Sequence, residues 1–167
     1  GLVGAKGQSM GSCKVTNSAF HGTIEASGNY VGGIIGSGYE AVSAPNSPCV
    51  TIQDCVVTGN VTGDNSVGGV LGGEPGINQC WSNGTGYVQN NVFSGKVSSS
   101  GSYVGGIIGK LDSLNLYNVI KDNTYTSNSG ATKGIGYVAM VDTSCETVDT
   151  SDSSVVYINT AKTPLPN

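Results

Sequence analysis

Residues 28–36 read GNYVGGIIG, and residues 101–109 repeat this stretch almost unchanged as GSYVGGIIG. A shorter version, DNSVGGVLG, lies between them at residues 64–72, and the chain opens on GLVG, which has the form of the end of one more copy. Self-similarity at a fixed period indicates a stack of equivalent structural units. The glycine-rich stretch therefore predicts a solenoid.

The repeat extends upstream of each glycine-rich stretch. One aromatic or aliphatic column recurs at intervals of 37, 36 and 32 residues, and its members are Phe20, Val57, Phe93 and Tyr125. These intervals lie within the range of about 20–50 residues that is typical of solenoids and propellers. Apolar residues alternate around this column, as expected for strands with one buried face. Two more interior columns are expected at Val15, Ile52, Val88 and Ile120, and at Ile24, Val61 and Val97.

These columns can stack only if the strands run parallel from rung to rung, about 4.8 Å apart. No helical periodicity competes, because β-branched residues, Gly, Asn and Ser dominate the chain. Parallel strand–crossover–strand connections are right-handed in nearly all proteins. We therefore predict an all-β fold, a right-handed parallel β-helix of about four rungs with loops inserted on one edge.

The repeats are expected to cover residues 1–138. Their rungs should lie near residues 1–13, 14–49, 50–87, 88–118 and 119–138. The pattern decays from residue 119 onward, which is typical of a terminal unit that shields the end of a solenoid. We expect a C-terminal cap at residues 139–160 and a linker at residues 161–167. Because the chain opens within a repeat, we also expect it to belong to a longer protein with other domains.

Two corners are expected in each rung. A column of short polar residues precedes the apolar column and consists of Asn17, Asp54, Asn90 and Asp122. Such side chains favour turns, so the column marks either a bend or an internal ladder of stacked amides, and both alternatives stay open. The Gly-Gly pair predicts a second corner, where the backbone approaches the next rung closely. We expect Tyr30 and Tyr103 to pack against the rungs, with Val67 in their place in the middle copy.

The five cysteines are dispersed and form no closely spaced pair of the kind that zinc sites use. They are Cys13, Cys49, Cys55, Cys80 and Cys145. Cys55 shares a column with Ser18, Asn91 and Asn123, and we expect it to be a small buried thiol. Cys13 and Cys49 precede the first strands of successive rungs. A disulfide between them is one possibility that spacing leaves open.

Composition narrows the classes of function. The chain carries a net charge of −4 and has no arginine, which disfavours nucleic acid and anionic membrane surfaces as partners. No apolar run approaches the roughly 20 residues that a membrane span needs. His21 is the only histidine, in a column with Thr58 and Ser94, and the repeat offers it neither an orienting partner nor a nucleophile.

Catalysis is not expected. The pectin-degrading lyases and hydrolases that share the β-helix class need clustered carboxylates, or a calcium-bound substrate with a basic group. The eleven acidic residues of this chain are scattered, apart from Asp54 and Asp122 in the turn column. We therefore predict no enzymatic activity, no metal and no cofactor.

The repeats diverge after each glycine-rich stretch, at residues 37–49, 73–87 and 110–118. Insertions at one point of a repeat emerge on one side of a solenoid, which is often the binding face. These segments contain Tyr39, Trp81, Tyr87 and Tyr117. Their rings would suit stacking on sugar rings, so we predict a ligand-binding edge there. The alternative is that the rings fold back and cover the side of the solenoid.

The succession of V-x-[ND]-x, G-x-[IV] and YVGGIIG resembles the GLUG-type repeats of bacterial cell-surface and secreted proteins. The resemblance covers about residues 1–138, and the opening GLVG fits the motif that gives these repeats their name. It implies an extracellular bacterial context, often within adhesin-like proteins or beside peptidase domains, and it brings no catalytic residues. Residues 139–167 depart from the pattern.

These observations predict a non-catalytic segment of an extracellular bacterial surface protein that binds a glycan or a host surface protein. A passive spacer that projects another domain is the first alternative. An accessory module of a larger secreted enzyme is the second.

Overall fold

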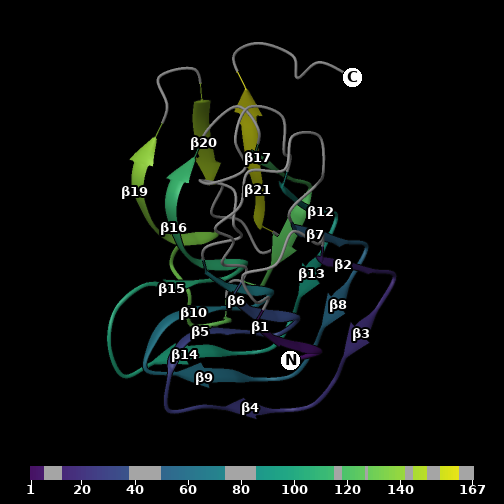
Figure 1. The fold of residues 1–167 in the computed structure, drawn as a ribbon, viewed down its shortest axis with the longest axis vertical. Coiled ribbons are helices and arrows are strands. Elements are labelled where there is room, and N and C mark those ends of the chain that lie inside the picture. Colours follow the sequence, from purple (N-terminus) through teal and green to yellow (C-terminus); the bar gives the residue numbers. More distant parts are fainter. Residues whose placement is uncertain are drawn as a thin grey trace.

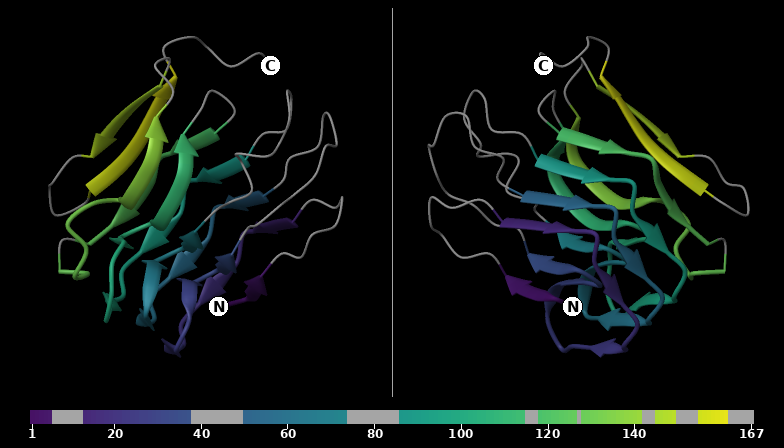
Figure 2. Two further views of the ribbon diagram at one scale, coloured as in Figure 1. Left: turned by 60° about the vertical axis from the view of Figure 1, so that its left-hand side comes forward. Right: turned by 90° about the vertical axis from the view of Figure 1, so that its right-hand side faces the viewer.

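The computed structural model of the chain describes residues 1–5, 13–37, 50–73, 86–114, 118–126, 128–141, 145–149 and 155–161. Every regular element in these ranges is a β-strand. Successive rungs lie on top of one another, from the N-terminal rung to the strands of the C-terminal region (Figures 1 and 2). Within these ranges there is no helix of the length and apolar character that a membrane crossing requires.

The strands form five sheets that run along the stack, and each rung contributes one strand to most of them. The largest wholly parallel sheet contains β1 (Val3–Ala5), β6 (Ile35–Ser37), β11 (Leu71–Gly73), β16 (Ile108–Leu114) and β19 (Ile135–Val141). Another contains β2 (Cys13–Thr16), β7 (Val50–Gln53), β12 (Gly86–Gln89) and β17 (Asn118–Lys121). Two three-stranded sheets contain β4 (Ile24–Glu25), β9 (Val61–Gly63) and β14 (Val97–Ser99), and β5 (Asn29–Gly32), β10 (Asn65–Gly68) and β15 (Val104–Gly105).

The remaining sheet joins the repeats to the C-terminal strands. It contains β3 (Ala19–Phe20), β8 (Val56–Val57), β13 (Val92–Phe93), β18 (Asn123–Tyr125), β21 (Val155–Ala161) and β20 (Cys145–Asp149). Strand β21 is antiparallel to both β18 and β20, whereas the pairings among the other described strands are parallel. The boundary expected after residue 138 falls inside β19, which continues in the parallel sheet to Val141. The expected linker, residues 161–167, lies outside the described residues except for Ala161.

The register confirms the predicted parallel β-helix. Val88 pairs with both Ile52 and Ile120, and Val57 pairs with both Phe20 and Phe93. Residues one repeat apart therefore occupy the same place in successive rungs. The third predicted column is confirmed as well, because Val61 pairs with Ile24 and Val97.

The interior consists of these columns. Phe93 and Val57 are fully buried, Tyr125 is 3% exposed, and Phe20 is half-buried because β3 ends its sheet and is covered on only one side. The aliphatic pairs that follow the glycines complete the core, and they are Ile34, Ile35, Val70, Leu71, Ile107 and Ile108. The prediction of a continuous interior shared by all rungs is confirmed.

The polar column forms a corner. Asn17, Asp54, Asn90 and Asp122 have φ angles of 49°, 55°, 53° and 55°, which place all four in the left-handed region. Asn and Asp tolerate this conformation better than other non-glycine residues. The bend alternative is therefore the right one for this column. A buried amide ladder also exists, but it begins one residue later, at Asn91 and Asn123.

The glycine pair forms the second predicted corner and faces the aromatic column across the core. A Cβ atom added at Gly33 would lie 2.7 Å from Cγ1 of Val57. At Gly69 it would overlap the ring of Phe93, and at Gly106 the ring of Tyr125. The second glycine of each pair thus leaves the space that the column residue of the next rung fills.

Two of the described cysteines, Cys13 and Cys55, lie within the parallel stack. Cys55 is fully buried, which confirms the predicted buried thiol. Cys13 begins β2 and pairs with Val50, the residue after Cys49. Cys49 itself lies outside the described residues, so a Cys13–Cys49 disulfide stays a prediction.

Candidate ligand-binding groove

The aromatic residues predicted to form a binding edge are only partly described. Tyr39, Trp81 and Tyr117 lie outside the described residues, so their role stays a prediction. Tyr87 lies in β12 rather than in a loop, in register with Thr51 and Val119, and its side chain is half-buried. The flanking strands β6, β11 and β16 stack in one sheet, and β7, β12 and β17 stack in another.

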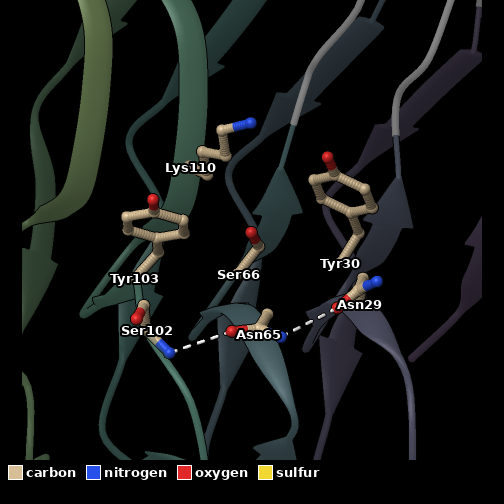
Figure 3. A pocket seen from close by; sticks show the side chains of 7 residues that line it. All are labelled: Asn29, Tyr30, Asn65, Ser66, Ser102, Tyr103 and Lys110. Atoms are coloured by element: carbon tan, nitrogen blue, oxygen red, sulfur yellow. Dashed lines mark hydrogen bonds between the residues drawn. The ribbon is translucent and has the colours of Figure 1, made fainter.

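A groove lies along the outer side of the sheet formed by β5, β10 and β15 (Figure 3). It encloses a volume of about 330 Å³. Its lining consists of Asn29, Tyr30, Asn65, Ser66, Ser102, Tyr103 and Lys110. We call this site the Tyr30–Tyr103 groove.

The register explains why there is a gap between the two tyrosines. Val67 pairs with Val31 and Val104, and Val67 is fully buried. The expectation that Val67 replaces the tyrosines is therefore wrong, because valine occupies the inward position in all three copies. The counterpart of Tyr30 and Tyr103 is the preceding residue, Ser66. A small side chain between two large ones leaves the space of the groove.

The backbone at this corner is unusual. Tyr30, Ser66 and Tyr103 have φ angles of 61°, 52° and 66°. The left-handed conformation costs a non-glycine residue roughly 1–2 kcal/mol, and it is uncommon for bulky side chains such as tyrosine. Backbone outliers of this kind are concentrated at ligand-binding sites, which makes them a pointer to function. In the groove they place two tyrosines on either side of one serine (Figure 3).

Each tyrosine ring rests on the next rung of the neighbouring sheet. The ring of Tyr103 stacks on Tyr137, with centroids 4.6 Å apart and planes inclined by 31°. The ring of Tyr30 covers Gly73, where an added Cβ would lie 2.6 Å from its Cδ1. Gly73, Lys110 and Tyr137 occupy the same position in successive rungs of this neighbouring sheet. Tyr30 lies against Gly73 and Tyr103 against Tyr137, so Ser66, between the two tyrosines, lies beside Lys110. The prediction that both tyrosines pack against the rungs is confirmed.

The base of the groove is polar and ordered along the stack. Asn65 donates from Nδ2 to Oδ1 of Asn29 at 3.1 Å, and the backbone N–H of Ser102 donates to Oδ1 of Asn65 at 2.9 Å (Figure 3). An asparagine amide offers two donors and two acceptor lone pairs, so these bonds leave part of its capacity for a ligand. Ser66 is 3% exposed and forms the floor, whereas Tyr103 is 38% exposed and forms a wall.

Other candidate chemistry lies away from the groove. His21 follows β3 and is exposed, and its Nδ1 lies 2.7 Å from Oγ1 of Thr58 in the next rung. Within the described part of the chain, no group of three or more His, Cys, Asp or Glu side chains could hold a metal ion. The groove therefore carries the functional argument.

No family model, curated protein or solved structure matches this chain. The functional argument therefore depends on the repeat and on the groove. Sequence analysis missed the groove because it aligned Tyr30 and Tyr103 with Val67. Aligning the three copies on their Val-Gly-Gly residues places serine between two tyrosines, and this alternation is the signal that would have found the site.

Proposed function

We propose that this chain is a non-catalytic, glycan-binding segment of an extracellular bacterial surface protein. The observation that supports the proposal most is the Tyr30–Tyr103 groove, in which two aromatic walls flank a serine floor beside a row of asparagine amides. Sugar rings present apolar C–H faces and hydroxyl edges. Aromatic rings suit the former, and amide or hydroxyl groups suit the latter. The resemblance to GLUG-type repeats supports the bacterial surface context.

The size of the groove favours a small ring over a protein partner. Its volume of about 330 Å³ lies at the lower end of the range of about 300–1,000 Å³ for small-molecule sites. A stable protein–protein interface buries about 800 Å² on each partner, which is far more than seven lining residues provide. One or two sugar rings are therefore the ligand that the groove suits best.

Replacing Ser66 with tyrosine tests the proposal. The backbone at Ser66 already has the left-handed conformation in which Tyr30 and Tyr103 are accommodated, so Ser66→Tyr is expected to fold. Its ring would fill the groove. The matched control is Ser94→Tyr, which adds the same ring at an exposed position just after β13, outside the groove. We expect the wild type and Ser94→Tyr to bind part of a panel of immobilised glycans, and Ser66→Tyr to bind at least about tenfold more weakly. Failure of the wild type to bind any glycan, or equal binding by Ser66→Tyr, would contradict the proposal.

A passive spacer is the second candidate. The parallel stack with a shared core supports it, because such an architecture extends by adding rungs and needs no ligand. A spacer would show no ligand binding, and all three proteins would behave alike in the panel. An accessory module of a secreted enzyme is distinguished by the domains that accompany the segment in the full-length protein.

A further inference from the structure

We propose that the Tyr30–Tyr103 groove selects sugars that carry an anionic substituent, and that the Nζ of Lys110 is the group that recognises it. This inference rests on the proposed function, and it adds the class of ligand. A carboxylate on a uronic acid and a sulfate on a sulfated sugar share the relevant chemistry, which is a negatively charged oxygen at the edge of a saturated ring.

The position of Lys110 supports the inference. Lys110 lies in β16, in register with Gly73 and Tyr137, and its half-buried side chain extends over Ser66 between the two tyrosines (Figure 3). The equivalent places in the neighbouring rungs hold glycine and tyrosine. The lysine of the rung that contains Tyr103 therefore lies beside Ser66, where serine interrupts the tyrosine wall. A ligand on the serine floor would lie directly beneath the ammonium group.

The charge of the lining is the second argument. Among the described residues that line the groove, Lys110 is the one that carries a charge, and the other six are asparagine, serine and tyrosine. The chain as a whole carries a net charge of −4, so its long-range field disfavours anions. The groove thus holds a positive charge on a chain whose net charge is negative. Hydrogen bonds to an ionised partner are roughly twice as strong as neutral ones, and the effect acts at short range.

A structural role for Lys110 is the competing explanation. The four-carbon stem of a lysine covers apolar surface while its ammonium group stays in water. In this case the stem would shield Ser66, and the charge would be irrelevant to binding. Lys110→Met separates the two roles, because methionine keeps much of the stem and removes the charge. Lys110→Arg keeps the charge.

The experiment titrates the whole chain with methyl glycosides in matched pairs and follows the amide NMR signals of the groove. The pairs are glucoside with glucuronide, galactoside with galacturonide, and galactoside with its 6-sulfate. We expect at least one anionic sugar to bind the wild type about tenfold more tightly than its neutral partner at low salt, the factor expected of one charge-assisted hydrogen bond. Salt should reduce this preference. The carboxylate and sulfate pairs show which anion is the source.

The variants decide which group recognises the anion. Lys110→Met should abolish the preference for the anionic sugar over its neutral partner, whereas Lys110→Arg should keep this preference. Lys133→Met is the control, because Lys133 is exposed and is not among the lining residues. Equal affinities within every pair, or an unchanged preference in Lys110→Met, would overturn the inference and leave glycan binding intact. Failure of every sugar to bind would overturn both.

Discussion

Asn91 donates a hydrogen bond from Nδ2 to Oδ1 of Asn123 in the next rung, 2.9 Å away, and both side chains are fully buried. The same Asn91 amide group also donates to the backbone carbonyl of Ile52 at 3.0 Å and accepts from the backbone N–H of Cys55 at 3.0 Å. Asn123 repeats this arrangement, since its Nδ2 donates to the carbonyl of Val88 at 2.7 Å and its Oδ1 accepts from the N–H of Asn91. The two amides connect three rungs through the corner.

Replacing Asn91 with leucine should strongly destabilise the folded chain. It leaves the N–H of Cys55, the carbonyl of Ile52 and the Oδ1 of Asn123 each without one hydrogen bond. Each buried polar group left unsatisfied costs about 1–3 kcal/mol, so we expect the free energy of unfolding to fall by about 3 kcal/mol or more. Urea titration measures this. Ser94→Ala, at an exposed position in the same rung, should change it by less than about 0.5 kcal/mol. A loss below about 1 kcal/mol in Asn91→Leu would show that the ladder contributes little.

Gly69→Ala should disrupt the second corner. Its Cβ would overlap both the carbonyl oxygen of Gly106 and the ring of Phe93, and neither is free to move, because one is backbone and the other is fully buried. We expect a loss of about 3 kcal/mol or more in stability. Gly28→Ala is the control, since an added Cβ there has no atom within 4 Å. Thermal unfolding followed by circular dichroism compares the two, and equal melting temperatures would refute the close packing at Gly69.

Phe93→Ala should cost about 3–5 kcal/mol, the usual range for truncating a fully buried aromatic residue. Phe20→Ala removes the same ring from the same column in the first rung, where the side chain is only half-buried, and should cost clearly less. Denaturant titration of both variants measures the difference. The reverse order would mean that the column is not covered more fully toward the middle of the stack.

Cys55 should make stability depend on alkaline pH. Burial raises the pKa of the Cys55 thiol, so the folded chain holds this proton more tightly than the unfolded chain does. The resulting stabilisation is fully present below the unfolded pKa of about 8.5 and is lost as the pH rises through the folded pKa.

Cys55→Ser is the comparison for this prediction. Cys55 donates from Sγ to the carbonyl of Gln53, and Ser18 makes the equivalent bond from Oγ to the carbonyl of Thr16, so serine suits the column. All other side chains are the same in the two proteins. Between neutral pH and about pH 10, the urea midpoint of the wild type should therefore fall more than that of Cys55→Ser. Parallel pH profiles would contradict the prediction.

The repeat made most of the fold predictable. Residues such as Val57 and Phe93 recur at a nearly constant interval, and a strand whose inner face is buried has only one register that keeps them inside. The polar corner was harder. Asn90 and Asn91 are both asparagine, and only the left-handed φ of Asn90 shows which of the two turns the chain and which points into the core.

The groove was not predictable from the same pattern. The core columns can be recognised because similar residues recur from rung to rung. The groove depends on a difference between rungs, since a serine occupies the position that holds tyrosine in the rungs on either side. Outward positions are weakly constrained by packing, so the sequence pattern does not reveal that Val67 points inward and Ser66 outward, as the register shows. The rings expected to form the binding edge belong to segments in which the repeats diverge, and there the period carries no information.

The most direct test of the central claim is to map a bound sugar on the chain by amide NMR. The ligand is the tightest binder from the glycan panel, titrated into isotope-labelled protein. We expect the largest changes in amide chemical shift at Asn65, Ser66 and Tyr103, which form the floor and one wall of the groove. In Ser66→Tyr, the same residues should show no such changes. Changes centred instead on Tyr39, Trp81 and Tyr117, with the groove signals unmoved, would contradict the account and place the binding site on the edge of variable segments.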